Sequence, residues 1–308
     1  MPKFLLTLFS VLAIAAMPAA AQNDTVVKLA GSNTIGGGLL AEYTRGYALK
    51  LGMGGTTIVE LPKPDEFDII ASRPENKGTL RVHVEAHGTG TGAARLFSGQ
   101  ADVWMASRRA NQSDLDQAKA AGGTEIPALA DLLKQETEHV IALDALTIVV
   151  HPSNRLRAIK QSQLREIFTG AIANWSQLGG PNQPIVVFGR DAKSGTFDTF
   201  CAIVVPGGEC AKALPTVAKK LLESSEDLMD SVNATPGAIG FVGYSFGRNG
   251  RTLAISNGCD MPNAATDFTI KAEEYPLSRR LYLYTRAKPS AAAREFVAYI
   301  QSAAAQAA

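Results

Sequence analysis

Short apolar and alternating segments recur along the chain, and segments with helical spacing separate them. Residues 39–52 place apolar side chains on one helix face and end at a glycine, which is a typical helix stop. The segments with strand character are 26–30, 81–86, 101–107 and 184–190. Strands that alternate with helices are typical of an α/β protein, and we predict that fold class for this chain.

Two segments bear on domain organisation. A chain of 308 residues is long enough for two domains. Residues 139–154 form a long apolar run of the kind that passes from one domain into another. Residues 53–80 mix short β-like pieces with proline and charge, and we expect a surface insertion there.

The N-terminal residues predict export. Residues 1–21 carry one lysine, an apolar run and then small residues, which is the layout of a secretory signal peptide cleaved after Ala21. The apolar run is well short of the ~20 residues that a membrane span requires. No cysteine follows this run, which disfavours a lipid-modified N-terminus. We therefore expect a soluble, exported mature chain.

The charge balance narrows the class of partner. Removal of the leader takes away Lys3, so the 30 basic residues become 29, against 29 acidic residues. A net charge near zero argues against nucleic acid or an anionic membrane as the main partner. Any attraction for a small anion must then be built locally.

The three cysteines are Cys201, Cys210 and Cys259. In an oxidising compartment Cys201 and Cys210, the nearest in sequence, are a plausible disulfide pair. Cys201 also falls on the apolar face of a predicted helix, beside Phe197 and Phe200. A buried free thiol is therefore the competing interpretation, and the sequence leaves both open.

Three turns of small residues occupy the same kind of position, between a predicted strand and a predicted helix. GSNT (31–34), GTGTG (88–92) and KSGT (193–196) each follow a predicted strand and open a predicted helix. The first turn of a helix leaves amide donors unpaired, and the helix dipole adds positive potential there. Small residues let an oxyanion approach closely, and hydroxyl groups add donors. Each turn alone is explained by ordinary helix capping, but three together indicate an anion site.

Arg190 stands beside the third turn. Three helix N-termini at about +0.5 charge each give roughly +1.5, which is similar to the one to two negative charges of phosphate. Arg190 adds a fork of donors suited to two oxygens of a tetrahedral anion. A nearly neutral protein can hold a small oxyanion in this way.

The motifs occur in the order GSNT, GTGTGAARL, ADVWMASR, LREIFTGAIANWSQLGG, GRDAKSGTFDTF and TPGAIGFVGY. In this order they resemble the periplasmic phosphate-binding proteins of ABC transporters, over nearly the whole mature chain. The resemblance implies a two-lobed clamshell, the type II periplasmic-binding-protein fold, in which each lobe is a central sheet flanked by helices. Matched by motif, the implied ligand-binding residues are Ser32, Asn33, Thr34, Thr89, Ser107, Arg108, Arg190, Ser194, Gly195 and Thr196.

One position departs from this family's pattern. Well-characterised members place an aspartate in the loop after the strand that matches 101–107, where it accepts the proton of phosphate. Arg108, after Ser107, stands there in this chain. Sulfate lacks that proton near neutral pH, so we expect phosphate to bind best by only a modest margin. Asp191 either neutralises Arg190 or turns inward as the missing acceptor.

The resemblance also implies a function and a division of the chain. One lobe would comprise residues 24–147 and 244–308, and the other residues 148–243, with crossings near Thr147 and Gly243. The protein would capture inorganic phosphate in the periplasm for an ABC permease and ATPase in the inner membrane. We expect a monomer without cofactor, metal or catalytic activity.

The sequence gives weaker support to other functions. A sulfate or molybdate binder is the nearest alternative, and a phosphate-releasing hydrolase that uses Ser194 is a more remote one. No histidine carries a triad motif, and the G-x-S-x-G pattern of a nucleophile elbow is missing. A nucleotide loop would need a glycine-rich run before Lys193.

Two further features invite a functional interpretation. His83 and His87 have metal-like spacing only on a helix. On the predicted strand they lie roughly 13 Å apart, too far to share one ion, and we expect structural histidines. Trp104 and Trp175 could belong to a protein-binding patch, but each lies in a family-like motif and we expect packing roles.

Overall fold

The computed structural model describes residues 24–76, 78–192, 194–206, 209–247, 250–257 and 261–307. The predicted signal peptide, Lys193 and Cys259 lie outside the described residues. Among the described residues, no helix combines the length and apolar character that crossing a membrane demands.

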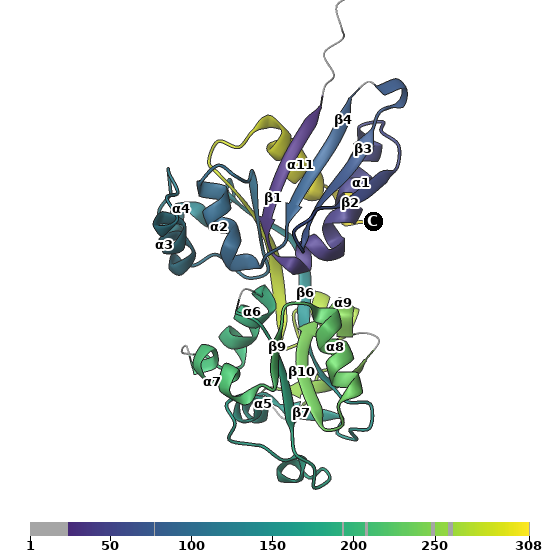
Figure 1. Cartoon of the computed structure of the whole chain (residues 1–308), viewed down its shortest axis with the longest axis vertical. Coiled ribbons are helices and arrows are strands. Elements are labelled where there is room, and N and C mark those ends of the chain that lie inside the picture. Colours follow the sequence, from purple (N-terminus) through teal and green to yellow (C-terminus); the bar gives the residue numbers. More distant parts are fainter. Residues whose placement is uncertain are drawn as a thin grey trace, which may run out of the picture.

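One continuous twelve-stranded sheet runs through two lobes in the described part of the chain (Figure 1). Its strand order is β2-β3-β4-β1-β5-β12-β6-β10-β8-β9, and β11 pairs with both β6 and β7. The strands are β1 (Thr25–Gly31), β2 (Thr56–Glu60), β3 (Glu66–Ser72), β4 (Thr79–Glu85), β5 (Val103–Ala106), β6 (Glu138–Val150), β7 (Ala158–Lys160), β8 (Val186–Arg190), β9 (Lys220–Leu222), β10 (Ala238–Gly243), β11 (Arg251–Ser256) and β12 (Ser278–Thr285). The predicted α/β class and the two-lobed architecture are confirmed.

Helices flank the sheet in both lobes (Figure 1). The α-helices are α1 (Leu40–Lys50), α2 (Thr89–Phe97), α3 (Gln112–Ala120), α4 (Leu129–Leu132), α5 (Gln161–Phe168), α6 (Gly195–Ile203), α7 (Glu209–Val217), α8 (Ser225–Ala234), α9 (Tyr244–Gly247), α10 (Asp267–Lys271), α11 (Ala291–Ile300) and α12 (Ala303–Gln306). A short π-helix, Ile35–Leu39, precedes α1.

The first strand explains where the site forms. Val27 and Leu29 on β1 are fully buried, and β1 pairs in parallel with β4 on one side and β5 on the other. The carboxyl ends of these three strands therefore lie at one edge of the sheet, and the chain leaves that edge through the turns that begin at Gly31, Gly88 and Ser107. Parallel pairing brings together residues that are far apart in the sequence.

The thirteen-residue strand β6 connects the lobes. Its first half pairs antiparallel with β12 in the upper lobe of Figure 1, and its second half pairs with β10 and β11 in the lower lobe. Its last six residues, from Ala145 to Val150, are all buried. The long apolar run at 139–154 thus passes between lobes, as its length predicted.

The pairing of β11 bears on where the chain returns to the first lobe, which the sequence placed near Gly243. β11 pairs with β7, and Leu253, Ile255 and Leu277 pack in the same core as the strands of the lower lobe. We therefore propose that lobe I comprises residues 24–144 and 278–307 and that lobe II comprises residues 145–277. A return near Gly243 would separate β11 from its partners.

Residues 53–80 form more than a surface insertion. β2 and β3 make an antiparallel hairpin that extends the sheet beyond β4. Most of β2 is exposed, but β3 buries Ile69 completely, so the expectation of a surface insertion is wrong for β3. The turn of this hairpin, residues 61–65, projects from lobe I.

Cys201 and Cys210 form a disulfide, with Cα atoms 5.3 Å apart. The bridge ties α6 to α7, and Cys210 is buried in the core of lobe II. The alternative of two free thiols does not hold for this pair.

Candidate functional site

The three small-residue turns meet between the lobes. In lobe I, Ser32 Oγ and Ser107 Oγ share a hydrogen bond, and the Ser107 amide donates to Thr89 Oγ1 at 3.0 Å. Gly195, at the first turn of α6 in lobe II, faces Thr89 and Ser107. A Cβ atom at this position would clash with Thr89 Oγ1 and lie 2.9 Å from Ser107 Cβ. Glycine is therefore required for the close approach of the two lobes.

A further contact shows that the lobes are closed on each other. Thr199 Oγ1, one turn along α6, donates to the Ser107 carbonyl at 3.2 Å. Ser107 and Thr89 are fully buried, and Ser194 and Thr196 are nearly so. The turns thus form one buried polar cluster, not three separate surface caps.

Ser194 acts locally as the N-cap of α6. Its Oγ accepts from the amides of Thr196 and Phe197 at 3.2 and 3.4 Å. Its own amide donates to Asp191 Oδ1 at 3.1 Å. Asp191 therefore orders the turn that precedes α6, and its charge also partly offsets the burial of Arg190, which was one of its two expected roles.

Arg190 is a buried cation at the end of β8, just before the third turn, with 3% of its surface exposed. Its guanidinium donates to Leu222 O at 3.1 Å, to Ser225 Oγ at 2.6 Å and to Glu223 O. Within the described part of the chain these acceptors are all neutral oxygens, and no carboxylate forms an ion pair with it. Burial lowers the pKa of Arg190 to about 10, partly offset by Asp191, so it stays charged at neutral pH.

A second buried arginine, not among the expected site residues, contacts two of the turns. Arg279 on β12 donates from Nε and Nη2 to Asp144 Oδ2, at 2.9 and 2.6 Å. Its Nη2 also reaches Thr34 Oγ1 at 3.1 Å, and its Nη1 lies 3.4 Å from Thr196 Oγ1. Arg279 therefore joins the first turn in lobe I to the third turn in lobe II. The charge of Arg279 further lowers the pKa of Arg190, so the two cations lie near each other.

Strand register creates this pair. Arg279 and Asp144 lie directly opposite each other on β12 and β6. Asp144 interrupts the apolar run 139–150, and Arg279 is buried at the start of an apolar strand. A charged residue inside each of two apolar segments was the available signal.

Arg108 does not join the cluster of turns. Its Nη atoms donate to both oxygens of Asp114 at 2.7 and 2.8 Å, and its Nε donates to Asp198 at 2.9 Å. Burial alone lowers the pKa of Arg108, but the two carboxylates outweigh burial and raise it. Burial raises the pKa of Asp198 even though Arg108 opposes that shift. Because Asp198 belongs to α6, this ion pair bridges the lobes.

Asn33 is half-buried between Ser32 and Thr34, where the helical turn that leads into the π-helix begins. The structure thus brings together eight of the ten expected residues. They are Ser32, Asn33, Thr34, Thr89, Ser107, Ser194, Gly195 and Thr196. Arg190 ends the strand before the third turn, with its donors turned to Leu222, Glu223 and Ser225. Arg108 lies beside them with its donors turned to Asp114 and Asp198.

This arrangement suits binding of an anion better than nucleophilic catalysis. All four histidines have partners away from Ser194: Asp68 for His83, Glu66 for His87, Thr285 for His139 and Ser153 for His151. Within the described residues Ser194 Oγ therefore has no imidazole base. The two tryptophans are fully buried, in agreement with their expected packing roles.

Comparison with known proteins identifies consistent relatives. A family model described as a PBP superfamily domain matches residues 67–304. The phosphate-binding protein PstS of Bacillus subtilis (strain 168) is 28% identical over 221 residues, which cover 72% of this chain and 66% of that protein. Protein SphX of Synechocystis sp. is 30% identical over 243 residues, which cover 74% of this chain and 68% of the relative. The chain thus spans about two thirds of the length of these relatives.

Solved structures share the architecture. A putative phosphate ABC transporter substrate-binding protein from Clostridium perfringens, with bound phosphate, superposes with a TM-score of 0.67 at 24% identity, covering 92% of this chain and 95% of that chain. An ABC-type phosphate transport receptor from Vibrio cholerae gives a TM-score of 0.62 at 24% identity, covering 91% and 96%. At this identity the likeness establishes the fold.

Proposed function

Because this chain belongs to the PBP superfamily, we propose that it is an exported solute-binding protein that captures inorganic phosphate for an ABC-type importer. Its relatives include proteins named for phosphate binding, and one similar structure holds phosphate. The ligand would lie between the lobes, among the three turns and the two buried arginines.

The observation that carries this proposal is the environment of Arg190. A buried charge is costly unless an opposite charge compensates it. The hydrogen bonds of Arg190 in the described structure go to neutral oxygens. An oxyanion beside it would supply a directly paired negative charge in addition to the through-space effect of Asp191, Glu223 and Asp65, and hydroxyl and amide groups of the turns would supply further donors. Ser32, Thr89, Ser107, Ser194 and Thr196 would contact the ligand.

Asp144 carries a carboxylate that could accept the proton of hydrogen phosphate, which the cation Arg108 cannot do. Its Oδ2 accepts both hydrogen bonds from Arg279, and its Oδ1 has no hydrogen-bond partner among the described residues. This carboxylate lies beside Thr34 and Thr196 through their shared contact with Arg279. We propose that Asp144 Oδ1 accepts the proton of hydrogen phosphate. Sulfate carries no such proton near neutral pH and would leave the carboxylate facing an anion.

The proposal includes the absence of turnover. Ser194 Oγ is engaged as a helix cap, and its partners are amides. The purified chain would release no phosphate from aryl phosphates, and Ser194→Ala would weaken binding without abolishing an activity. A monomer in the periplasm, working with a permease and an ATPase of the inner membrane, is the corresponding physiological setting.

Calorimetry at pH 7 tests the ligand assignment. We expect phosphate to bind more tightly than sulfate or molybdate, and scattering to give a smaller radius of gyration with saturating phosphate, because the ligand contacts both lobes. Phosphate that gives no heat while sulfate or molybdate binds tightly would reverse the assignment. Steady hydrolysis that disappears in Ser194→Ala would place the protein among enzymes.

A further inference from the structure

We propose a second ligand site, for a divalent transition-metal ion, formed by Asp65, His87 and Glu223 where the two lobes face each other. One oxygen of each carboxylate and one ring nitrogen of His87 lie within 4.8 Å of one another. Asp65 and Glu223 are exposed, and His87 is half-buried. This site does not depend on the proposed phosphate function.

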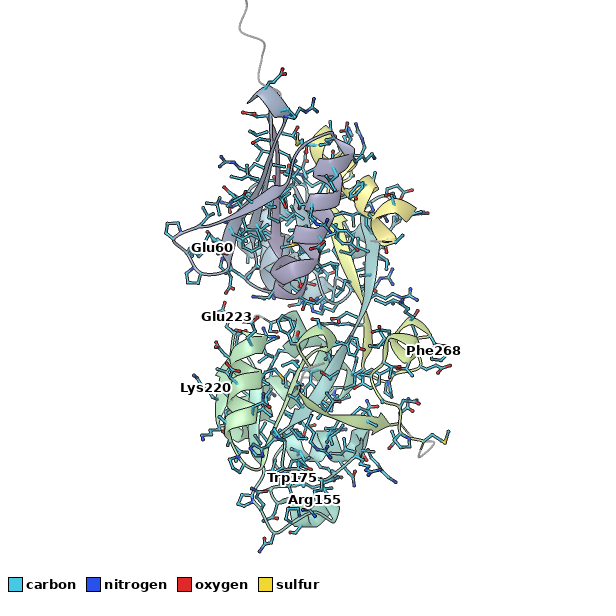
Figure 2. The ribbon with its side chains drawn as sticks, turned by 90° about the vertical axis from the view of Figure 1, so that its right-hand side faces the viewer. Glu60, Arg155, Trp175, Lys220, Glu223 and Phe268 are labelled. Carbon is cyan, nitrogen blue, oxygen red and sulfur yellow. A yellow bond between two sulfur atoms is a disulfide. The ribbon has the colours of Figure 1, made fainter. Side chains whose placement is uncertain are left out.

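Three separate segments deliver these donors. Asp65 ends the turn of the β2–β3 hairpin, and His87 lies between β4 and α2, so both belong to lobe I. The Ala86 amide donates to the Asp65 carbonyl at 2.8 Å and holds the hairpin turn against the loop of His87. Glu223 lies between β9 and α8, at the end of lobe II that faces lobe I (Figure 2). The projecting turn of residues 61–65 would thus supply one ligand of the metal ion.

Hydrogen bonds from Arg190 hold the loop that carries Glu223. Arg190 donates to the carbonyl oxygens of Leu222 and Glu223 and to Ser225 Oγ. These bonds fix the backbone on both sides of Glu223, while its exposed side chain extends toward lobe I. The backbones that carry all three donors are therefore positioned before any ion binds.

A carboxylate outside the donor set already holds one ring nitrogen of His87. Its Nε2 forms a hydrogen bond of 2.9 Å with Glu66 Oε1, a carboxylate that is not one of the three donors. If Nε2 carries the proton in this bond, the lone pair remains on Nδ1. Ligating histidines generally donate their other ring N–H to a carboxylate or carbonyl in this way. His83, by contrast, pairs with Asp68, in keeping with the prediction that His83 and His87 do not share an ion.

The donor set selects the class of metal. One imidazole and two carboxylates suit Zn²⁺ and neighbouring transition metals, whereas Ca²⁺ and Mg²⁺ prefer oxygen ligands only. Ligands at about 2.1 Å in a tetrahedral set lie about 3.4 Å apart, so these side chains must draw in by about 1 Å. The exposure of both carboxylates permits that adjustment.

An ion at this place would link metal binding to closure. The carboxylates of Asp65 and Glu223 come from opposite lobes and approach each other in the closed arrangement. A divalent ion bound to both would bridge the lobes. Metal binding should therefore favour the closed arrangement even without phosphate.

Calorimetry with Zn²⁺ tests the site in phosphate-free, non-coordinating buffer. We expect the full chain to bind one equivalent of Zn²⁺ and to show no comparable binding of Mg²⁺. His87→Gln, Asp65→Asn and Glu223→Gln should each weaken Zn²⁺ binding by about tenfold or more. His83→Gln is the matched control, because it removes the neighbouring histidine of β4 and should leave the affinity for Zn²⁺ unchanged.

Small-angle scattering tests the bridge separately. Zn²⁺ alone should reduce the radius of gyration of the wild-type chain and of His83→Gln, but not that of Glu223→Gln. Wild-type protein that binds no equivalent of Zn²⁺, or His87→Gln that binds it equally well, would overturn the site. Unchanged Zn²⁺ affinity in Glu223→Gln would overturn the contribution of lobe II. Since phosphate is absent from these measurements, none of these outcomes bears on the proposed capture of phosphate.

Discussion

Arg108 and Arg190 occupy comparable positions in the two lobes but have opposite electrostatic surroundings. Each comes at or just after the carboxyl end of a buried strand, β5 or β8, and each is largely buried. Arg108 faces the carboxylates of Asp114 and Asp198, whereas Arg190 donates to neutral oxygens among the described residues. Two carboxylates pair directly with the first cation, whereas Asp191, Glu223 and Asp65 act on the second only through space. The identity of the partners, not burial, separates a structural arginine from one that can bind an anion.

The largest expected effect is on stability, at Arg108. Arg108→Gln would leave two largely buried carboxylates without their counterion, and loss of one partner of a buried pair typically costs about 3–5 kcal/mol. We expect a melting temperature lower by several degrees in calorimetry. Arg280→Gln is the control, since Arg280 pairs with Glu273 at the surface and should contribute at most ~1 kcal/mol. Equal stability of the two variants would refute the structural role of Arg108.

The next effect is on affinity, at Arg190. Arg190→Gln removes the cation that faces neutral oxygens, and we expect phosphate binding to weaken by roughly 2–5 kcal/mol while the fold is retained. Isothermal calorimetry gives the affinity and circular dichroism verifies the fold, again with Arg280→Gln as control. A folded Arg190→Gln variant with wild-type phosphate affinity would remove this residue from the ligand site and end the contrast with Arg108.

Asp144 and Asp198 extend the comparison to the carboxylates, each paired with a buried arginine between the lobes. Asp144→Asn retains the shape but cannot accept from hydrogen phosphate as a charged acceptor, which is worth about 1.5–3 kcal/mol. We expect phosphate binding to weaken by that amount relative to sulfate binding. Asp198→Asn should leave the ratio of the two affinities unchanged. Calorimetric titration of both anions into both variants decides the matter, and a ratio that Asp144→Asn does not alter would exclude Asp144 as the acceptor.

The smallest effect is the pH dependence of stability at Asp198. Burial raises the pKa of this carboxyl above its ordinary value of 3.8, so the folded state binds the proton more tightly than the unfolded state. The stability contributed by this group is therefore present below the unfolded pKa and is lost as the pH rises through the folded pKa. Urea denaturation from pH 3.5 to 7 should show wild type losing stability relative to Asp198→Asn as the pH rises. A gain relative to the variant would contradict the direction of this shift.

The sequence predicted those parts of the site that depend on residues close together in the chain. The turns at Gly31, Gly88 and Ser194 follow strands and start helices, and parallel pairing of β1, β4 and β5 explains why the first two turns meet. The strand run beginning near 139 was also evident from its length and apolar character. Local patterns suffice wherever neighbouring residues determine the conformation.

What the sequence did not predict depends on pairing between distant segments. The opposition of Arg279 and Asp144 results from the register of β12 against β6, across a separation of 135 residues. The position of β11 in lobe II depends on its pairing with β7, which no local signal at residues 251–256 reveals. Arg108 was assigned to the ligand by its place in the motif. The sequence does not reveal its carboxylate partners, Asp114 and Asp198, because they lie on separate helices, one of them in the other lobe.

The shared strand β6 also bears on how the protein unfolds. Its two halves are hydrogen-bonded into both lobes, and its later residues belong to the buried core of lobe II. If either lobe unfolded, one half of β6 would lose its pairing partners, and that half is continuous with the half paired in the other lobe. We expect the amides of β6 to exchange with deuterium more slowly than those of the exposed edge strand β2, and heating to give one cooperative transition, with equal calorimetric and van't Hoff enthalpies. Two lobes would then behave as a single unit of folding.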